Sequence, residues 1–404
     1  MIKSERRLKL ALGLCLLAFS VHSQNWNLSD APSLSWQSLA GSLDGTKLVV
    51  VSLYDASGSS PGQIYTSTNS GQNWNLTSAP SNYWFSVASS ADGVRLVAAA
   101  DDDPSQNPDY PGPICLSTNG GSTWQTSSVP ANTWQAVASS TNGQVLVGNA
   151  YGDGIYISTN FGTSWNLATN APTNGSWDSL TVSADGSKIY ATAYDSIYIS
   201  TNTGATWTNT APTLGEWWPV ACSPDGKTVF AGIYGGIIYA STNSGSTWNP
   251  SYNQTLNWQC LAMSTNGSVV LAGANGDSLY LSANGGAAWS LQTSAILPPS
   301  PAWQCDYCSA NGGSLVAGAN GDTIYLAAPV PIPMIHIQTV ANHAVISWPA
   351  SATTAGFQLQ TVAVLQPAAA WTTNGLNGIS QIGTNSVYTN SLTAPSAFFR
   401  LHQP

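Results

Sequence analysis

Histidine is absent from residues 24–328 of this 404-residue chain, and charged side chains are scarce, at 7% of the sequence. The same stretch has one arginine, Arg95, and one glutamate, Glu216. Without histidine it can hold neither a Ser-His-Asp triad nor a zinc site with imidazole ligands. Aspartate is the plentiful acid, so hydrolytic chemistry here would depend on carboxyl groups alone.

Helical periodicity is also missing after residue 23, and the long apolar run at residues 10–21 is too short to cross a membrane comfortably. That run follows four basic residues and precedes Val21-His22-Ser23, a plausible cleavage site. We therefore expect residues 1–23 to be a signal peptide, and the mature chain to be secreted, or to lie at the cell surface or in the periplasm, without a transmembrane segment. The net charge of −9 argues against a nucleic-acid partner.

Cysteine is rare as well, and five cysteines remain after the expected signal peptide. Because five is odd, at least one thiol is unpaired or pairs between chains. The last two have C-x-x-C spacing, but alternation along a strand sends their thiols to opposite faces. We interpret all five as small buried residues rather than as redox or metal ligands. They are Cys115, Cys222, Cys260, Cys305 and Cys308.

What the sequence has in abundance is a short box, in which a polar turn follows an alternating apolar strand and ends at a tryptophan. Residues 200–207, STNTGATW, are one of six. Asn tolerates left-handed backbone and Gly adopts it without steric cost, so N-x-G closes a hairpin. The box tryptophans are 50, 41, 42, 41 and 41 residues apart, a spacing typical of propeller or solenoid repeats. They are Trp74, Trp124, Trp165, Trp207, Trp248 and Trp289.

A second recurrence is a strand led by tryptophan that ends in Ser-x-Asp-Gly or Ser-x-Asn-Gly and is followed by another apolar strand. With the box, each unit has four strands, which predicts an all-β, seven-bladed β-propeller over residues 24–328. Seven such strands meet six boxes, and residues 24–30 look like the missing outermost strand. We expect them to complete the seventh blade and close the ring. The leading tryptophans are Trp36, Trp84, Trp134, Trp177, Trp217, Trp258 and Trp303.

The box resembles the Asp-box, or BNR repeat, of sialidase-like propellers, whose pattern is S-x-D-x-G-x-x-W. The chain is also similar to photosystem II assembly-factor-like propellers, which are binding scaffolds, and to WD40- and YVTN-like propellers. Asn replaces the aspartate in all six boxes and keeps an acceptor oxygen, so we expect the turn to survive. In sialidases the box lies away from the active site, so the resemblance implies a fold and not a chemistry. Sialidases hold their substrate with three arginines, which argues against that activity here.

The composition changes at residues 329–333, a proline-rich run that we interpret as a stiff linker. Residues 334–404 contain short strand-like runs and resemble the fibronectin type III-like modules of secreted bacterial proteins. We expect a small β-sandwich that serves as an attachment or spacer module.

Two aspartates depart from the repeat. Asp178 stands where other units have Gln after the leading tryptophan, and Asp306 replaces an apolar residue. Two carboxyl groups suffice for glycoside hydrolysis, and similar propellers include two-aspartate xyloglucan hydrolases, so these are the catalytic candidates if the chain is an enzyme. Those enzymes normally join two propellers around a cleft, whereas one is expected here. We predict that Asp306 lies deeper in the channel and that the two groups are too far apart for catalysis.

The leading tryptophans should encircle one mouth of the channel, either as packing between blades or as an aromatic platform for a ligand. We predict a non-catalytic binding or scaffold protein for a carbohydrate or protein ligand outside the cytoplasm, without a cofactor. An Asp-dependent glycoside hydrolase is the alternative. The candidate ligand-binding residues are Trp36, Tyr83, Trp84, Trp134, Trp177, Trp217, Trp218, Trp258 and Trp303.

One loop carries four aspartates, Asp101, Asp102, Asp103 and Asp109. Carboxylate oxygens suit calcium, although a solvated acidic loop is the simpler interpretation.

Overall fold

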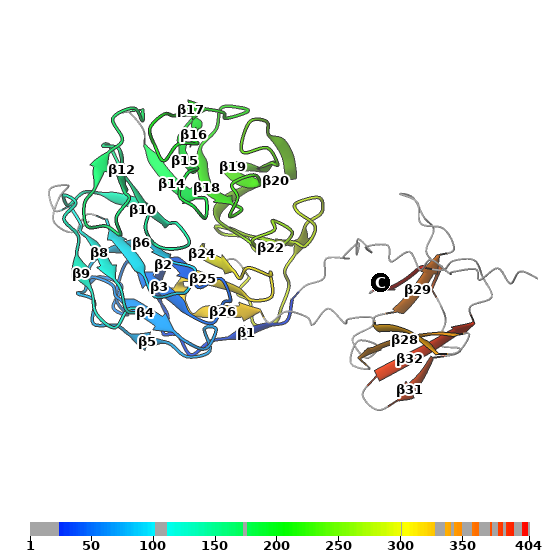
Figure 1. Ribbon diagram of the computed structural model, residues 1–404. Helices are drawn as coiled ribbons and strands as arrows, with labels where there is room; N and C mark the ends of the chain where they lie inside the picture. Colours follow the sequence, from blue (N-terminus) through cyan, green and yellow to red (C-terminus); the bar gives the residue numbers. More distant parts are fainter. Residues whose placement is uncertain are drawn as a thin grey trace, which may run out of the picture. The chain divides into compact units, whose positions relative to one another are not determined.

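The structure, a computed structural model, describes residues 24–101, 111–172, 176–299 and 301–327, and the strands between residues 336 and 402. The chain divides into two compact units, one spanning Val21–Val330 and the other containing Pro331–Pro404. Every described element is a β-strand, so the prediction of an all-β chain is confirmed for the described residues (Figure 1). None of these residues forms a helix that could cross a membrane. The expected signal peptide and linker lie outside the described residues.

Three sheets of the first unit each have four antiparallel strands in sequence order. The first holds β6 (Trp84–Ser89), β7 (Leu96–Ala100), β8 (Ile114–Ser117) and β9 (Gln125–Thr126). The second holds β10 (Trp134–Ser139), β11 (Leu146–Ala150), β12 (Ile155–Ser158) and β13 (Asn166–Leu167). The third holds β14 (Trp177–Val182), β15 (Ile189–Ala193), β16 (Ser196–Ser200) and β17 (Thr208–Asn209).

Two further sheets of this unit are larger, because neighbouring repeats are joined by hydrogen bonds or by continuous strands. One has six strands: β18 (Trp217–Cys222), β19 (Val229–Ser241), β20 (Asn249–Met263), β21 (Val270–Ala274), β22 (Leu279–Ser282) and β23 (Ser290–Leu291). The other has eight: β1 (Trp26–Leu28), β2 (Leu34–Gly41), β3 (Leu48–Ser52), β4 (Ile64–Ser67), β5 (Asn75–Leu76), β24 (Trp303–Cys308), β25 (Leu315–Asp322) and β26 (Ile324–Ala327).

The first strand of the chain pairs with the last strand of this unit. In the antiparallel ladder of β1 and β26, Trp26 lies opposite Ala327. The backbone N–H of Gln24 donates to Oε1 of Gln292 at 2.8 Å, and Oγ1 of Thr323 donates to the carbonyl of Ala31 at 2.8 Å. Residues 24–31 therefore cover the outer edge of the sheet that contains β24, β25 and β26.

The turn between the first and second strands of a repeat is built by a serine and an aspartate or asparagine. In the turn after β14, Ser183 Oγ accepts a hydrogen bond from the backbone N–H of Lys188, and Asp185 Oδ1 accepts one from that of Ser187, each at 3.0 Å. Hydrogen bonds from Ser183 and Ser187 lower the pKa of Asp185 to about 2. Asn142 does the same work in another repeat, accepting from the backbone of Gln144 at 2.9 Å. Turn formation thus accounts for these aspartates.

The box turn uses its asparagine in two ways. Oδ1 of Asn202 accepts hydrogen bonds from Ser200 Oγ and from the backbone N–H of Thr206, at 3.0 and 2.9 Å. Its amide Nδ2 donates to Oγ1 of Thr206 at 2.9 Å. The serine hydroxyl in turn accepts from the backbone of Gly204 at 2.8 Å. An aspartate could accept in the same way but could not donate. Asparagine therefore fits a box in which the side chain four residues later, here that of Thr206, offers an acceptor.

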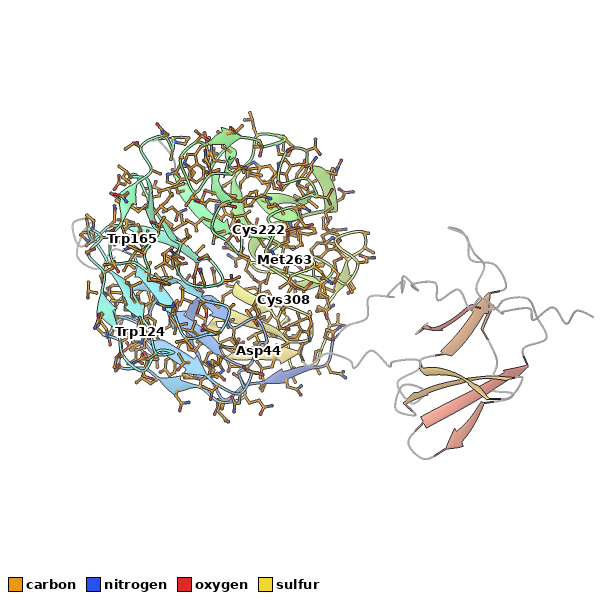
Figure 2. All side chains as sticks on the ribbon, in the orientation of Figure 1. Asp44, Trp124, Trp165, Cys222, Met263 and Cys308 are labelled. Carbon is orange, nitrogen blue, oxygen red and sulfur yellow. The ribbon has the colours of Figure 1, made fainter. Side chains whose placement is uncertain are left out.

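The core of the unit lies between neighbouring sheets and is centred on the leading tryptophans. Trp177, for example, packs with Val147 and Ile155 of the preceding sheet and with Leu180 of its own. Its ring meets that of Tyr198 edge to face, with centroids 5.5 Å apart. Such pairs add to the stability that apolar burial provides. The box tryptophans are only partly buried, and Figure 2 shows Trp124 and Trp165 toward the outside of the unit.

The second unit has two antiparallel sheets. One contains β27 (His336–Val340), β28 (His343–Pro349), β32 (Asn385–Ser391) and β31 (Ile379–Ile382) in that order. The other contains β30 (Thr372–Thr373), β29 (Gln358–Val362) and β33 (Phe398–His402).

Candidate functional site

A β-bulge follows every leading tryptophan. In β14, Trp177 pairs with Ala193 and Ser179 with Thr192, so Asp178 is the extra residue of the pair. The same shift follows the leading tryptophan in β2, β6, β10, β20 and β24, and in β18 the register shifts between Trp217 and Val220, across Trp218 and Pro219. A bulge re-aims side chains and frequently occurs beside functional sites.

A cavity of about 310 Å³ is lined by the three residues that follow each leading tryptophan. The first of the three forms a mainly polar ring, which we call the bulge ring, and the third forms a mainly apolar one. The bulge ring consists of Gln37, Phe85, Gln135, Asp178, Trp218, Gln259 and Gln304. The apolar ring consists of Leu39, Val87, Val137, Leu180, Val220, Leu261 and Asp306. Both aspartates singled out by the sequence therefore line one cavity.

The seven leading tryptophans are 0–1% exposed, and Tyr83 is 6% exposed and stacks edge to face on Tyr54. The tryptophan rings fill the space between neighbouring sheets and present no face to a ligand, so packing accounts for them. Among the aromatic residues predicted to bind ligand, Trp218 is the one that is partly exposed and lines the cavity.

Asp178 is a bulge-ring residue with a strongly perturbed carboxyl group. Burial, with a smaller contribution from the nearby carboxylate of Glu216, raises the pKa of Asp178 to about 7. A raised carboxyl pKa favours both proton transfer near neutral pH and the capture of a positive charge, because a neighbouring cation would restore ionisation.

Asp306 lies farther along its strand, where it pairs with Ala317. Burial raises its pKa well above the usual range, although hydrogen bonds from Cys260 and from the backbone of Ala262 act in the opposite direction. Its Oδ2 atom is buried without a hydrogen-bond partner. Asp306 is thus a carboxyl group in an otherwise apolar ring, and an unpaired buried oxygen of this kind is costly unless it has a use.

Glu216 was not predicted to belong to the site, although it is the single glutamate between residues 24 and 328. It immediately precedes Trp217, and its carbonyl accepts a hydrogen bond from the backbone N–H of Tyr234 at 2.8 Å. The Tyr234 ring stacks on that of Trp218, with centroids 4.6 Å apart and planes tilted by 31°. An acidic pair, Asp178 and Glu216, therefore lies close to an aromatic pair. The signal that could have identified Glu216 is that no other glutamate occurs in residues 24–328.

Metal and thiol chemistry have no visible basis in the described part of the chain. There, no group of three or more His, Cys, Asp or Glu side chains is arranged to hold a metal ion. Of the calcium candidates, Asp101 is described, whereas Asp102, Asp103 and Asp109 lie outside the described residues. All five cysteines are free thiols, and burial raises the pKa of Cys222 to about 12, which keeps it protonated and unreactive.

No family model and no curated protein sequence matches this chain. Solved structures similar to it include YCF48 bound to a D1 peptide, at 14% identity and a TM-score of 0.57, covering 78% of this chain and 99% of that one. YCF48 from Cyanidioschyzon merolae is similar at 14% identity and a TM-score of 0.56, and the match covers 75% of this chain and 98% of that one. The GH74 xyloglucanase from Xanthomonas campestris is similar at 13% identity and a TM-score of 0.61. The match covers 81% of this chain and 59% of the xyloglucanase, so this chain spans about three fifths of the length of that enzyme. These likenesses show a β-propeller fold, and they include both a peptide-binding protein and a glycosidase.

Proposed function

We propose that this chain is an exported, non-catalytic binding or scaffold protein that holds a glycan or protein ligand at its central cavity. The observation that carries the proposal is the bulge ring, in which every repeat contributes one side chain to a shared, partly exposed rim. Amide, carboxyl and aromatic groups on a rigid apolar scaffold are typical of a binding site. The propeller neighbour that holds a peptide is consistent with it.

The proposal includes an architecture. We propose a seven-bladed propeller over residues 24–328, closed by residues 24–30, after a signal peptide at 1–23 and before a linker at 329–333 and a fibronectin type III-like module at 334–404. Seven leading tryptophans and the pairing of β1 with β26 support the ring. The two antiparallel sheets after residue 336 support the sandwich.

A binding screen tests the proposed function. The chain from Gln24 to Pro404 should bind a member of a glycan array or a peptide array saturably, and Trp218→Ala should weaken that binding. Leu214→Ala is the control, because Leu214 is 80% exposed and does not line the cavity. Absence of any ligand, or a ligand indifferent to Trp218→Ala, would contradict the proposal.

The alternative is an Asp-dependent glycoside hydrolase that uses Asp178 and Asp306. It is favoured by one observation: two carboxyl groups with raised pKa values line the same cavity, and a general acid must be protonated at working pH. We expect no cleavage of xyloglucan, β-glucans or sialosides, measured as released reducing ends or free sialic acid. Turnover that Asp178→Asn or Asp306→Asn abolishes would establish the hydrolase instead.

A further inference from the structure

The basic residues of the first unit are confined to one end of the strands, where the same turns also contain Asp44, Asp92, Asp185 and Asp225. Residues 24–327 contain four basic residues, and each lies in the turn between the first and second strands of its repeat. Successive turns of antiparallel strands alternate between the two ends of a sheet. All the basic residues are therefore at one end, and the leading tryptophans begin at the other. The four are Lys47, Arg95, Lys188 and Lys227.

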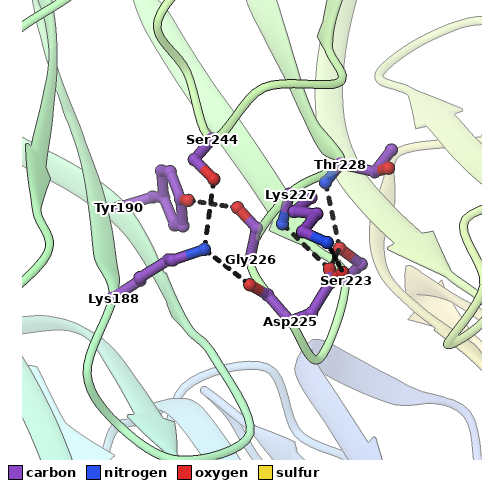
Figure 3. A network of polar contacts seen from close by, with 8 residues as sticks. All are labelled: Lys188, Tyr190, Ser223, Asp225, Gly226, Lys227, Thr228 and Ser244. Carbon is purple, nitrogen blue, oxygen red and sulfur yellow. Dashed lines mark hydrogen bonds and ion pairs between the residues drawn. The ribbon is translucent and has the colours of Figure 1, made fainter.

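Each of the four basic side chains has a contact partner at its own end of the strands. Nζ of Lys188 donates to the carbonyl of Asp225 at 2.7 Å and to Ser244 Oγ at 3.1 Å, and Lys227 lies 3.7 Å from the Asp225 carboxylate (Figure 3). Similarly, Nζ of Lys47 donates to the carbonyl of Asp92 at 2.9 Å. The guanidinium of Arg95 lies over a phenylalanine ring, 3.9 Å from its centroid. Three of these cations contact a neighbouring repeat and Lys227 contacts its own turn, and all four lie at the other end of the strands from the bulge ring.

The opposite end carries acids without basic neighbours in sequence. Glu216 precedes a leading tryptophan, Asp178 follows one, and five aspartates lie in or at the edge of the connections between second and third strands. A surface with one sign of charge at the rim of a cavity attracts ligands of the other sign. Four of them, Asp55, Asp153, Asp195 and Asp277, lie in the turns, and Asp322 is the last residue of β25.

Three tyrosines join these acids on one arc. In three consecutive repeats, tyrosine directly follows the residue that pairs with the leading tryptophan. Two of them, Tyr151 and Tyr194, are 57% and 58% exposed, and the third, Tyr234, stacks on Trp218. Single exposed aromatic residues are ordinary, but equivalent ones on three adjacent repeats, at the end of the strands where the leading tryptophans begin, form a continuous series. We call Tyr151, Tyr194, Tyr234, Trp218, Asp178 and Glu216 the aromatic-acidic arc.

The cavity behind the arc contains a further unsatisfied group. Oδ2 of Asp306 is buried without a hydrogen-bond partner among the residues that line the cavity. It is independent of the arc, since it comes from a different sheet and a deeper position. An occupant that reaches into the cavity with N–H donors would satisfy that oxygen.

We propose that the aromatic-acidic arc binds a peptide segment rich in Lys or Arg, with one cationic side chain entering the cavity beside Asp178 and Glu216. This inference rests on the proposed binding function and assigns its ligand class. A cation gains from the aromatic faces of Trp218 and the tyrosines and from the carboxylates together, whereas a neutral sugar would have to desolvate the carboxylates without that return. The extended arc suits a chain, and the cavity suits one side chain.

The test uses the chain from Gln24 to Pro404 and a short synthetic peptide of Arg, Lys, Ser and Gly. Its control is the same peptide with citrulline and acetyl-lysine in place of Arg and Lys, which removes the charge and keeps the shape. Calorimetry should show binding of the cationic peptide at least about tenfold tighter than that of the neutral one, weakening as NaCl rises from about 0.05 to about 0.5 M.

Variants locate the binding. The double variant Asp178→Asn, Glu216→Gln should lose about tenfold or more in affinity, and Tyr194→Ser should lose several-fold. Asp185→Asn is the matched control at the opposite end of the strands, where Asn142 already occupies the equivalent turn position, and it should change nothing.

Equal binding of the neutral peptide, or loss of affinity in Asp185→Asn but not in the double variant, would overturn the inference. If the cationic peptide fails while a neutral glycan binds and depends on Trp218, the inference is wrong and the binding function stands. If neither class binds, both are wrong.

Discussion

Asp178 and Asp306 show how strongly the position of an aspartate along a strand changes the pKa of its carboxyl group. Asp178 is the extra residue of a bulge at a polar rim and feels Glu216, whereas Asp306 lies in a ring of Leu and Val side chains. Asp178 is partly exposed and its pKa rises to about 7, whereas burial among apolar side chains raises the pKa of Asp306 well above its usual range.

The raised pKa of Asp178 predicts a pH-dependent stability. The native chain holds this proton up to about pH 7, whereas an unfolded aspartate, with a pKa near 3.8, has released it. The contribution of Asp178 to the free energy of unfolding is therefore full below about pH 4 and is lost as pH rises through about 7. Asp178→Asn should raise the free energy of unfolding by roughly 1 to 4 kcal/mol at high pH and have little effect at low pH.

Denaturant titrations at several pH values measure this difference. Gln259→Asn is the control, because it changes a bulge-ring side chain that does not titrate. A stability change in Asp178→Asn that is the same at every pH would show that the carboxyl group is not perturbed.

At the scale of the element, the box turn imposes a left-handed backbone on a position that only two boxes fill with glycine. Thr203 has a φ of 53° and Phe161 one of 61°, whereas Gly120 and Gly285 occupy the equivalent places at 65° and 68°. Any side chain is disfavoured in this region and a β-branched one such as that of Thr203 most of all, so the four turns without glycine here carry strain that the surrounding hydrogen bonds must hold.

Thr203→Gly should therefore stabilise the chain, by up to about 1 kcal/mol, because relief of the left-handed strain exceeds the entropy cost of glycine. The backbone bond from its N–H to the carbonyl of Ser187 remains possible. Gly204→Ala should have the opposite effect, since an added Cβ would lie 2.0 Å from Cδ1 of Ile157. Thermal melts of both variants measure the pair, and a lower melting temperature for Thr203→Gly would contradict the strain argument.

Much of the element structure could be predicted from the sequence, because its signals are local. Alternating apolar residues, Ser-x-Asp-Gly turns and N-x-G boxes each specify their own hairpin, and the similarity of residues 24–30 to an outermost strand predicted a pairing that β1 makes with β26. The site was harder to predict because its geometry depends on register. Simple alternation does not reveal that one residue is extra after Trp177, so the sequence left packing and ligand binding as alternatives for tryptophans that the structure buries.

At the scale of the whole molecule, the first unit is held together by contacts between residues nearly three hundred positions apart. Trp26 is 4% exposed and belongs to a core cluster with Tyr325 and Ala327. Without β1, the edge of β26 would be open to pairing with another chain.

A chain that begins at Ser33 should therefore melt more than about 5 °C below one that begins at Gln24, since it loses a buried tryptophan and a strand pairing. Scanning calorimetry measures the difference, and light scattering should detect association through β26. Equal melting temperatures would contradict the proposed ring closure.

The repeated bulge assigns core packing and cavity lining to different residues of the same strand. The tryptophan before it and the apolar residue two places after it build the unit, while the extra residue faces the cavity and carries no ladder partner of its own. Residues 37, 85, 135, 178, 218, 259 and 304 can therefore be randomised together, much as antibody loops are diversified, without rewriting the core. The scaffold is a starting point for libraries of affinity reagents whose specificity is determined by the seven bulge-ring positions.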